Sequence, residues 1–298
     1  MKIGIDLGGS HIAVGIIQDN KIIYKLEKDL YEKEKGPENI TNLIINIVNA
    51  LIKQNNIKKE EIEIIGIACP GIVEKEIVRK AKNLAIDIID FKKVLEKEYE
   101  GIKINIINDA KAAAIAEKEY GVLTPYQYCI MLTMGTGIGG AVFYNGKLLE
   151  GKNSAAFEVG HMIIHKNGRT CSCDSKGCFE AYGAIRNLRK QVEGYLGKEI
   201  TGAELVEILK DSNKVVEIEE ILEEYIDNLA IGLSNLSNIF EPEAIALGGS
   251  IVYYKDIILD RLNYKLKNEK YIFNQNNIPT ILMAKLNNDA GMIGATIA

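Results

Sequence analysis

Residues 2–24 read KIGIDLGGSHIAVGIIQDNKIIY, and residues 128–149 read YCIMLTMGTGIGGAVFYNGKLL. Each stretch predicts a β-meander: an apolar strand, a glycine-containing corner, a second strand, a tight turn and a third strand. At an offset of 127 residues, Asp6 aligns with Thr133 and Gly8 aligns with Gly135. The repeat predicts two similarly built domains, each with a corner that turns its backbone amides toward a common gap.

Strands and helices alternate along the rest of the chain. Apolar runs predict strands at 63–68, 103–107, 244–247 and 280–284, and three-and-four spacing predicts helices at 37–56, 202–209, 216–240 and 255–267. An alanine-rich helix opens at Asn108-Asp109 and is expected to stop at Gly121 with a left-handed cap. We therefore expect an α/β protein with a domain at 1–120 and a second domain at 121–288. A short C-terminal helix, 289–298, is expected to pack back on the first domain.

The composition is that of a globular protein. The 298 residues include 36 Lys and Arg against 41 Asp and Glu, for a net charge of −5, and 47% are hydrophobic. This mild negative balance argues against a nucleic-acid partner, because phosphate backbones bind concentrated basic faces. No apolar run reaches the roughly 18 residues of a membrane span, and the N-terminus lacks a signal-peptide core. We expect a cytoplasmic protein with no membrane partner.

Both glycine corners are candidate phosphate sites. Gly8 and Gly9 would let backbone amides approach an anion, Ser10 adds a hydroxyl donor, and Asp6 stands where Mg²⁺ would be held against phosphates. A plain hairpin is the alternative for one such corner, but residues 133–140 contain four glycines and two threonines, more than a turn needs. Neither corner has the ending of a P-loop or the following helix of a dinucleotide fingerprint.

Asn108 and Asp109 close a strand and open a helix. Both residue types are good helix N-caps, which is one interpretation. The other is catalytic, because a carboxylate at the carboxyl end of a strand can serve as a general base at a mouth shared with the phosphate corners.

One histidine and three cysteines form a candidate metal site. His161, Cys171, Cys173 and Cys178 would suit a closed tetrahedral zinc site, whereas three incidental cysteines are the alternative. Glu158 and Glu180 flank the cluster and would be rigidly held acceptors for sugar hydroxyls. No functional role is expected for the remaining cysteines and histidine that we considered. Cys69 and Cys129 are expected in the core, and His165 is expected to be an ordinary polar residue.

These motifs together resemble the ROK family, which comprises bacterial sugar kinases, sugar-responsive repressors and uncharacterised relatives. The resemblance covers nearly the whole chain. It rests on Asp6-Leu7-Gly8-Gly9-Ser10-His11, Pro70-Gly71, Asn83-Leu84, Asn108-Asp109-Ala110, Gly135-Thr136-Gly137-Ile138-Gly139-Gly140, Glu158-Val159-Gly160-His161, Cys171-Ser172-Cys173, Gly177-Cys178-Phe179-Glu180, Gly248-Gly249-Ser250 and Ala290-Gly291-Met292-Ile293-Gly294-Ala295.

The resemblance implies a two-domain, actin/hexokinase-like ATPase fold with a cleft between the domains, and a homodimer. It also implies a role for each matched residue. Asp109 would be the catalytic base toward a sugar 6-hydroxyl, and the other hydroxyls would be held by Asn83, Asn108, Glu158, His161 and Glu180. The phosphates and Mg²⁺ of ATP would be held by Asp6, Gly8, Gly9, Ser10, His11, Thr133, Gly135, Thr136 and Gly137, with Gly248 and Gly249 near the adenosine. Structural Zn²⁺ would be held by His161, Cys171, Cys173 and Cys178.

The sequence departs from the family pattern at a few positions. Phe157 and Asp174 stand where glycine is common, and Lys111 replaces a frequent Asn. The segment 87–91 lacks the aromatic residue that often follows Asn-Leu in the family. Phe157 and the segment 87–91 border the expected sugar pocket, so these departures leave the identity of the sugar open.

The resemblance implies an ATP-dependent hexose 6-kinase, with glucose as the first choice of substrate. N-acetylmannosamine, N-acetylglucosamine, fructose, mannose and allose are the alternatives. A sugar-sensing repressor is a second class, but repressors of the family carry a helix-turn-helix before the first glycine corner, which here begins at residue 6. A catalytically silent sugar binder is a third, and the presence of both Asp6 and Asp109 argues against it.

Overall fold

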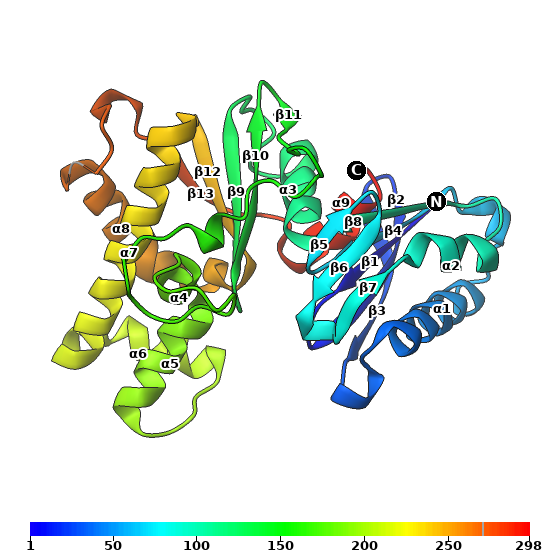
Figure 1. Cartoon of the computed structure of the whole chain (residues 1–298), viewed down its shortest axis with the longest axis horizontal. Coiled ribbons are helices and arrows are strands. Elements are labelled where there is room, and N and C mark those ends of the chain that lie inside the picture. The colour runs from blue at the N-terminus through cyan, green and yellow to red at the C-terminus, as the bar shows by residue number, and fades with distance from the viewer. Residues whose placement is uncertain (270) are drawn as a thin grey trace. The chain divides into compact units, whose positions relative to one another are not determined.

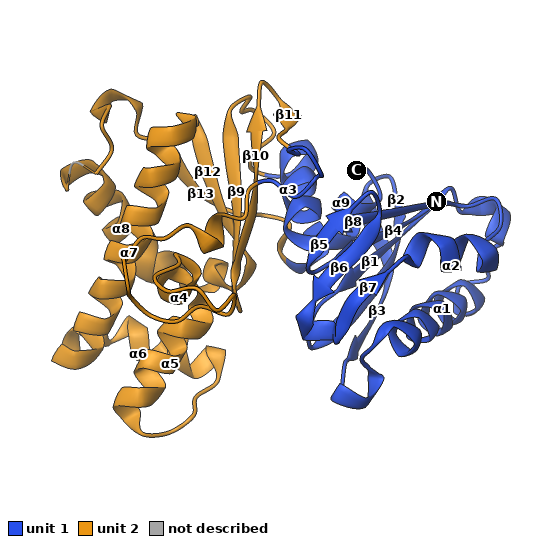
Figure 2. Ribbon diagram, in the orientation of Figure 1, with its two compact units in different colours: residues 1–121, 150–156, 288–298 blue, residues 122–149, 157–287 orange. Residues whose placement is uncertain are grey.

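The computed structural model describes residues 1–269 and 271–298, which divide into two compact units (Figure 2). The first unit comprises Met1–Gly121, Glu150–Ala156 and Asn288–Ala298, and the second comprises Val122–Leu149 and Phe157–Asn287. The segment Glu150–Ala156, which the sequence placed in the second domain, thus belongs to the first unit. The reason is long-range: the side chain of Lys111, on the first unit's helix α3 (Asp109–Tyr120), donates a hydrogen bond to the carbonyl of Ser154.

The first unit is built on a five-stranded sheet of order β3-β2-β1-β4-β8. The meander supplies β1 (Lys2–Leu7), β2 (His11–Gln18) and β3 (Lys21–Asp29), and then β4 (Ile64–Cys69) and β8 (Lys103–Asn108) are added in parallel with β1. In this register Asp6 lies opposite Ala68, and Cys69 lies opposite Asn108. The carboxyl ends of three parallel strands therefore bring Asp6 and Asn108 to one edge of the sheet.

The second unit repeats this arrangement in the order β11-β10-β9-β12-β13. Its meander comprises β9 (Cys129–Met134), β10 (Ile138–Tyr144) and β11 (Lys147–Leu148), and β12 (Ala244–Gly248) and β13 (Thr280–Met283) run parallel with β9. The corners differ slightly. The Gly8 amide donates to the His11 carbonyl at 2.9 Å, whereas the Gly135 amide donates to the Gly137 carbonyl at 3.0 Å, so the second corner is one residue tighter.

Helices α1 (Pro37–Gln54) and α2 (Phe91–Glu98) pack beside the first sheet (Figure 1). The side of α1 that faces the core carries Ile40, Ile44, Val48 and Leu51, all buried, which is the spacing of one helix face. Strands β5 (Ile72–Glu74), β6 (Ile77–Ala81) and β7 (Ile86–Ile89) form a small antiparallel sheet that the sequence did not predict.

The C-terminal helix α9 (Ala290–Ala295) packs against α3, β1 and β4. Backbones meet closely there: a Cβ on Gly294 would lie 1.8 Å from the Ala112 carbonyl oxygen, and one on Gly66 would lie 2.1 Å from that of Ala295. The end of α3 differs from expectation, because Gly121 has a φ of −113° and is not left-handed. Glycine at position 121 is explained instead by the lack of room for a side chain, since a Cβ there would meet the Glu117 carboxylate.

The second unit covers its sheet with a larger helical layer: α4 (Glu180–Gly183), α5 (Ile185–Leu196), α6 (Gly202–Lys210), α7 (Val216–Phe240) and α8 (Lys255–Asn268). Its core gathers around α7, where Tyr225, Leu229 and Leu233 are fully buried.

Cys69 and Cys129 are buried as expected. Short 3-10 turns occupy 32–34, 59–61, 82–84, 159–161, 212–214, 249–254, 275–277 and 287–289. Among the described residues, no helix combines the length and apolarity needed to cross a bilayer.

Candidate active site

Asp6 lies just before the first glycine corner of unit 1, and its carboxyl group lies against helix α9. A Cβ on Gly291 would lie 2.9 Å from the carboxyl carbon of Asp6, so glycine there leaves room for the carboxylate. A Cβ on Gly9 would lie 2.8 Å from Cβ of Asn83, which places the Asn83 side chain directly against this corner. Ser10 and His11 follow at the exposed start of β2. The structure therefore gathers Asp6, Asn83 and the corner glycines at one place.

Of the two interpretations that the sequence left open for Asn108 and Asp109, the structure shows the helix cap. Asn108 is the N-cap of α3: its side-chain oxygen accepts from the Lys111 amide at 3.2 Å, and its amide group donates to the Gly71 carbonyl at 3.1 Å. Asp109 accepts from the Ala110 amide through one oxygen at 2.8 Å. The cap is thus Asn108, and the Ala110 amide helps to hold the Asp109 carboxylate at the helix N-terminus.

Burial shifts the pKa of both carboxyl groups upward. The pKa of Asp6 rises to about 7, first because its carboxyl is desolvated and second because of the negative charge of Asp109, while Lys25 opposes the rise. Desolvation also raises the pKa of Asp109, against the lowering effect of the hydrogen bond from Ala110. A carboxylate of raised pKa is a stronger proton acceptor near neutral pH than an exposed one, as a general base requires.

The second corner, in unit 2, is packed against the loop that follows β12. Gly248 lies opposite Thr133 in the parallel register. Gly249 has a φ of +77°, and a Cβ there would lie 2.8 Å from the Met134 carbonyl oxygen. The hydroxyl of Ser250 donates to the same carbonyl at 3.4 Å. The two glycine-containing loops predicted to contact ATP in this unit, residues 133–137 and 248–249, are therefore neighbours.

The four predicted metal ligands converge. The ligand atoms of His161, Cys171, Cys173 and Cys178 all lie within 4.8 Å of one another. Nδ1 of His161 is 3.6 Å from Sγ of Cys171, and Sγ of Cys173 is 3.7 Å from Sγ of Cys178. A tetrahedral zinc ion with Zn–S bonds of about 2.3 Å requires S–S separations of about 3.7 Å. The donor set and its spacing fit zinc.

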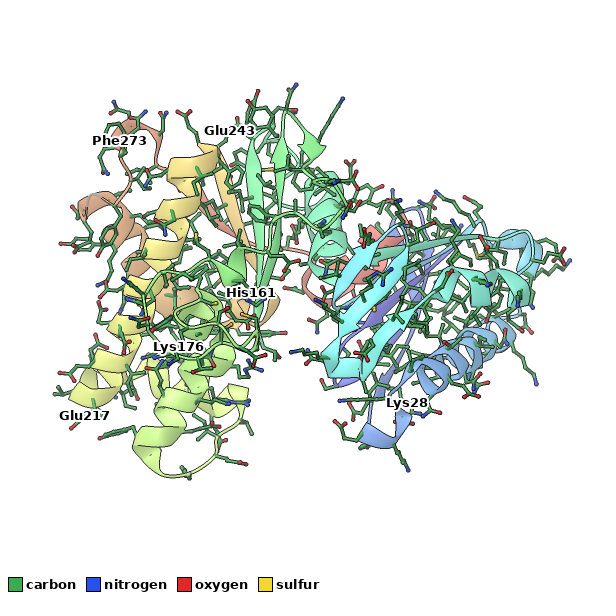
Figure 3. All side chains as sticks on the ribbon, viewed as in Figure 1. Lys28, His161, Lys176, Glu217, Glu243 and Phe273 are labelled. Carbon is green, nitrogen blue, oxygen red and sulfur yellow. The ribbon has the colours of Figure 1, made fainter. Side chains whose placement is uncertain are left out.

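The backbone of the cysteine loop, which we define as residues 161–178, supports this arrangement. The Cys171 amide donates to the Ser175 carbonyl at 2.8 Å, and the Gly177 amide donates to the Arg169 carbonyl at 2.9 Å. A hydrogen bond from the Ser175 backbone lowers the pKa of Cys173 to about 7, which favours the thiolate that metals bind. Figure 3 labels His161 and Lys176 of this loop. His165 also anchors it, since Nε2 lies 2.6 Å from Oδ1 of Asn228 on α7.

The two acids predicted to hold sugar hydroxyls differ in their surroundings. Glu158 is exposed and stands next to the 3-10 turn that carries His161. Glu180 is buried, and its oxygens accept from the Ile138 amide at 3.0 Å and the Ser172 hydroxyl at 2.5 Å. Ser172 and the Ile138 amide were missed by sequence reasoning. The position of Ser172 between the candidate ligands Cys171 and Cys173 was a signal that could have been used. A backbone amide such as that of Ile138 leaves no signal in a sequence.

The structure shows the surroundings of three departures from the family pattern. Phe157 has a φ of +76° and Asp174 a φ of +70°, so both occupy a backbone conformation that favours glycine. The ring of Phe157 packs edge-on to Phe240 at 5.5 Å between centroids, and this contact helps to offset the unfavourable backbone. Lys111 is buried and bonded to the Ser154 carbonyl, so this departure fastens the segment 150–156.

Known proteins resemble this chain over nearly its full length. The chain is 30% identical to a glucokinase of Thermotoga maritima, over 98% of this chain and 95% of that protein. It is 27% identical to a xylose repressor of Caldicellulosiruptor bescii, over 98% of this chain and 76% of the repressor. The crystal structure of a ROK hexokinase from Thermus thermophilus superposes with a TM-score of 0.82 at 26% identity, covering 99% and 96% of the two chains.

The structural likeness confirms the expected α/β, actin/hexokinase-like ATPase fold. The sequence pattern of the ROK family matches residues 2–298, which is nearly the full length, and on that ground this chain belongs to the ROK family.

Proposed function

We propose that this protein is an ATP-dependent kinase that phosphorylates a hexose at its 6-hydroxyl, with glucose as the first candidate substrate. The observation that carries the proposal is the pair Asp6 and Asp109. Two half-buried carboxyl groups of raised pKa stand at the end of parallel strands, beside a glycine corner suited to phosphate. The glucokinase and hexokinase among its relatives support the same reaction.

In this reaction Asp109 takes the proton of the sugar 6-hydroxyl. The hydroxyl oxygen forms a bond to the γ-phosphorus while the bond from that phosphorus to the β–γ bridging oxygen breaks, and ADP leaves with that electron pair. Asp6 would hold the Mg²⁺ that enters with ATP, and the backbone amides of the two corners, Gly8-Gly9 and Gly135–Gly137, would donate to the phosphate oxygens.

The remaining predicted ligands complete the proposal. Asn83, Asn108, Glu158, His161 and Glu180 would bind sugar hydroxyls, and Gly248 and Gly249 would lie near the adenosine. Zinc held by the four-ligand cluster would be structural, because all four positions of a tetrahedral site are filled by protein donors. Glu180 would bind sugar only with oxygen lone pairs that Ile138 and Ser172 leave over.

A second candidate function is sugar sensing without catalysis, which the likeness to a xylose repressor favours. The two candidates differ in their dependence on Asp109. A sensor needs sugar affinity alone, whereas a kinase needs a base as well.

The test is an ADP-release assay with Mg²⁺-ATP over glucose, N-acetylmannosamine, N-acetylglucosamine, fructose, mannose and allose, with the Asp109→Asn variant as control. We expect turnover of at least one hexose, a product with phosphate on carbon 6 by NMR, and loss of turnover in the variant. Sugar binding by calorimetry with no ADP release for any hexose would contradict the kinase and favour the sensor.

A further inference from the structure

Glu180 occupies a position between the cysteine loop and the second glycine corner. Its side chain is 8% exposed, and its carboxylate is bonded on both sides. One oxygen accepts from the hydroxyl of Ser172, which lies between the ligands Cys171 and Cys173, at 2.5 Å. The other accepts from the amide of Ile138, the first residue of β10 after the corner, at 3.0 Å. One rigid carboxylate thus connects two segments that are 34 residues apart in sequence (172 to 138).

The corner is shaped around this carboxylate. A Cβ on Gly137 would lie 2.4 Å from the Glu180 oxygen that bonds Ile138, so glycine is required there by Glu180 itself and not by a phosphate alone. A second tether lies close by: the amide of Arg186, at the start of α5, donates to the Gly135 carbonyl at 3.1 Å. The short α4, which begins at Glu180, is in turn fixed to α7 by the hydroxyl of Tyr225, which donates to the Gly183 carbonyl at 3.0 Å.

We propose that Glu180 is a positioning residue that couples the cysteine loop to the second glycine corner, so that metal occupancy of the loop sets the order of the corner. Zinc fixes Cys171 and Cys173, and Ser172 is held between them. Ser172 orients the Glu180 carboxylate, and that carboxylate fixes the Ile138 amide and closes the corner. Where the corner binds phosphate, a point that rests on the proposed function, loss of zinc weakens nucleotide binding as well as sugar binding.

The primary test is hydrogen–deuterium exchange of peptides covering residues 133–140 in the full-length, zinc-loaded protein, because the Ile138 amide reports the contact directly. Ser172→Ala removes one bond to Glu180 without removing a ligand. We expect at least about fivefold faster exchange in Ser172→Ala and in wild type stripped of zinc. A larger effect is expected in Glu180→Gln. Its side-chain NH2 group is itself a donor, so it cannot accept a hydrogen bond from both the Ile138 amide and the Ser172 hydroxyl. Lys176→Ala, an exposed change in the same loop, is the matched control and should leave exchange unchanged.

Combining zinc removal with Glu180→Gln separates coupling from a general loosening of the fold. Zinc removal should accelerate exchange of the corner much less in Glu180→Gln than in wild type, because the connection is already broken. Unchanged exchange in Ser172→Ala with full zinc content by metal analysis, or an equal effect of zinc removal in wild type and Glu180→Gln, would overturn the proposal. Neither readout requires turnover, so a protein that phosphorylates no hexose would refute the proposed function and still decide the coupling.

Discussion

The raised pKa of Asp6 predicts that this carboxylate destabilises the fold at neutral pH. Its pKa rises from an ordinary value of 3.8 to about 7, chiefly through desolvation. A raised pKa means that the folded protein holds a proton that the unfolded chain releases. The folded state therefore loses stability as pH rises from about 4 to about 7, and the full penalty applies above that range.

The size of the penalty follows from the same shift. At about 1.4 kcal/mol for each pKa unit, a rise of this extent corresponds to roughly 4 kcal/mol. Asp6 is only half-buried and part of the shift comes from Asp109, so we expect Asp6→Asn to raise the free energy of unfolding at pH 8 by about 2 to 4 kcal/mol. At pH 4 the gain should shrink toward zero, because wild-type Asp6 is then protonated in the folded state.

Urea unfolding at pH 4 and pH 8 in Mg²⁺-free buffer, followed by far-UV circular dichroism, measures this difference. The chain has no Trp, so the helix signal is preferable to fluorescence. Glu60→Gln, which changes an exposed acid of the same unit, is the control and should change stability by less than about 0.5 kcal/mol. Equal stability of Asp6→Asn and wild type at pH 8 would refute the reasoning, as would a gain that is the same at both pH values.

Four further outcomes are expected. Asp109→Asn should lower kcat for the hexose by at least about 100-fold with KM changed only a few-fold, and near-normal turnover in the folded variant would exclude Asp109 as the base. Metal analysis should find one zinc per chain, and Cys173→Ser should lose it; a metal-free wild type with a disulfide, purified anaerobically, would contradict the site. Gly294→Ala should destabilise the protein by about 1 to 3 kcal/mol or more, because its Cβ would lie 1.8 Å from the Ala112 carbonyl. Gly194→Ala, whose Cβ in helix α5 meets nothing within 4 Å, should instead stabilise it by about 0.5 to 1 kcal/mol in thermal unfolding.

Local pattern was enough for much of this protein. The two meanders, the glycine corners and the helix at 216–240 could be predicted because periodicity, turn residues and glycine act on neighbours in the chain. The candidate zinc ligands could be predicted for the same reason, since three of the four lie within eight residues, at 171–178. A metal site of this kind can be predicted from a short stretch of sequence, because the fold has only to bring His161 to the three cysteines.

Contacts between distant residues were decided by the tertiary structure alone. The sequence indicates an acid at Glu180 but cannot show that the Ile138 amide and the Ser172 hydroxyl share it, because backbone donors have no residue type. Likewise, the segment 150–156 joins the first unit through the carbonyl of Ser154, and the pKa of Asp6 depends on burial that many segments create together. The sequence pattern identified the candidate residues, whereas packing determined the pKa shifts of Asp6 and Asp109, the hydrogen-bond partners of Glu180 and the space beside each glycine.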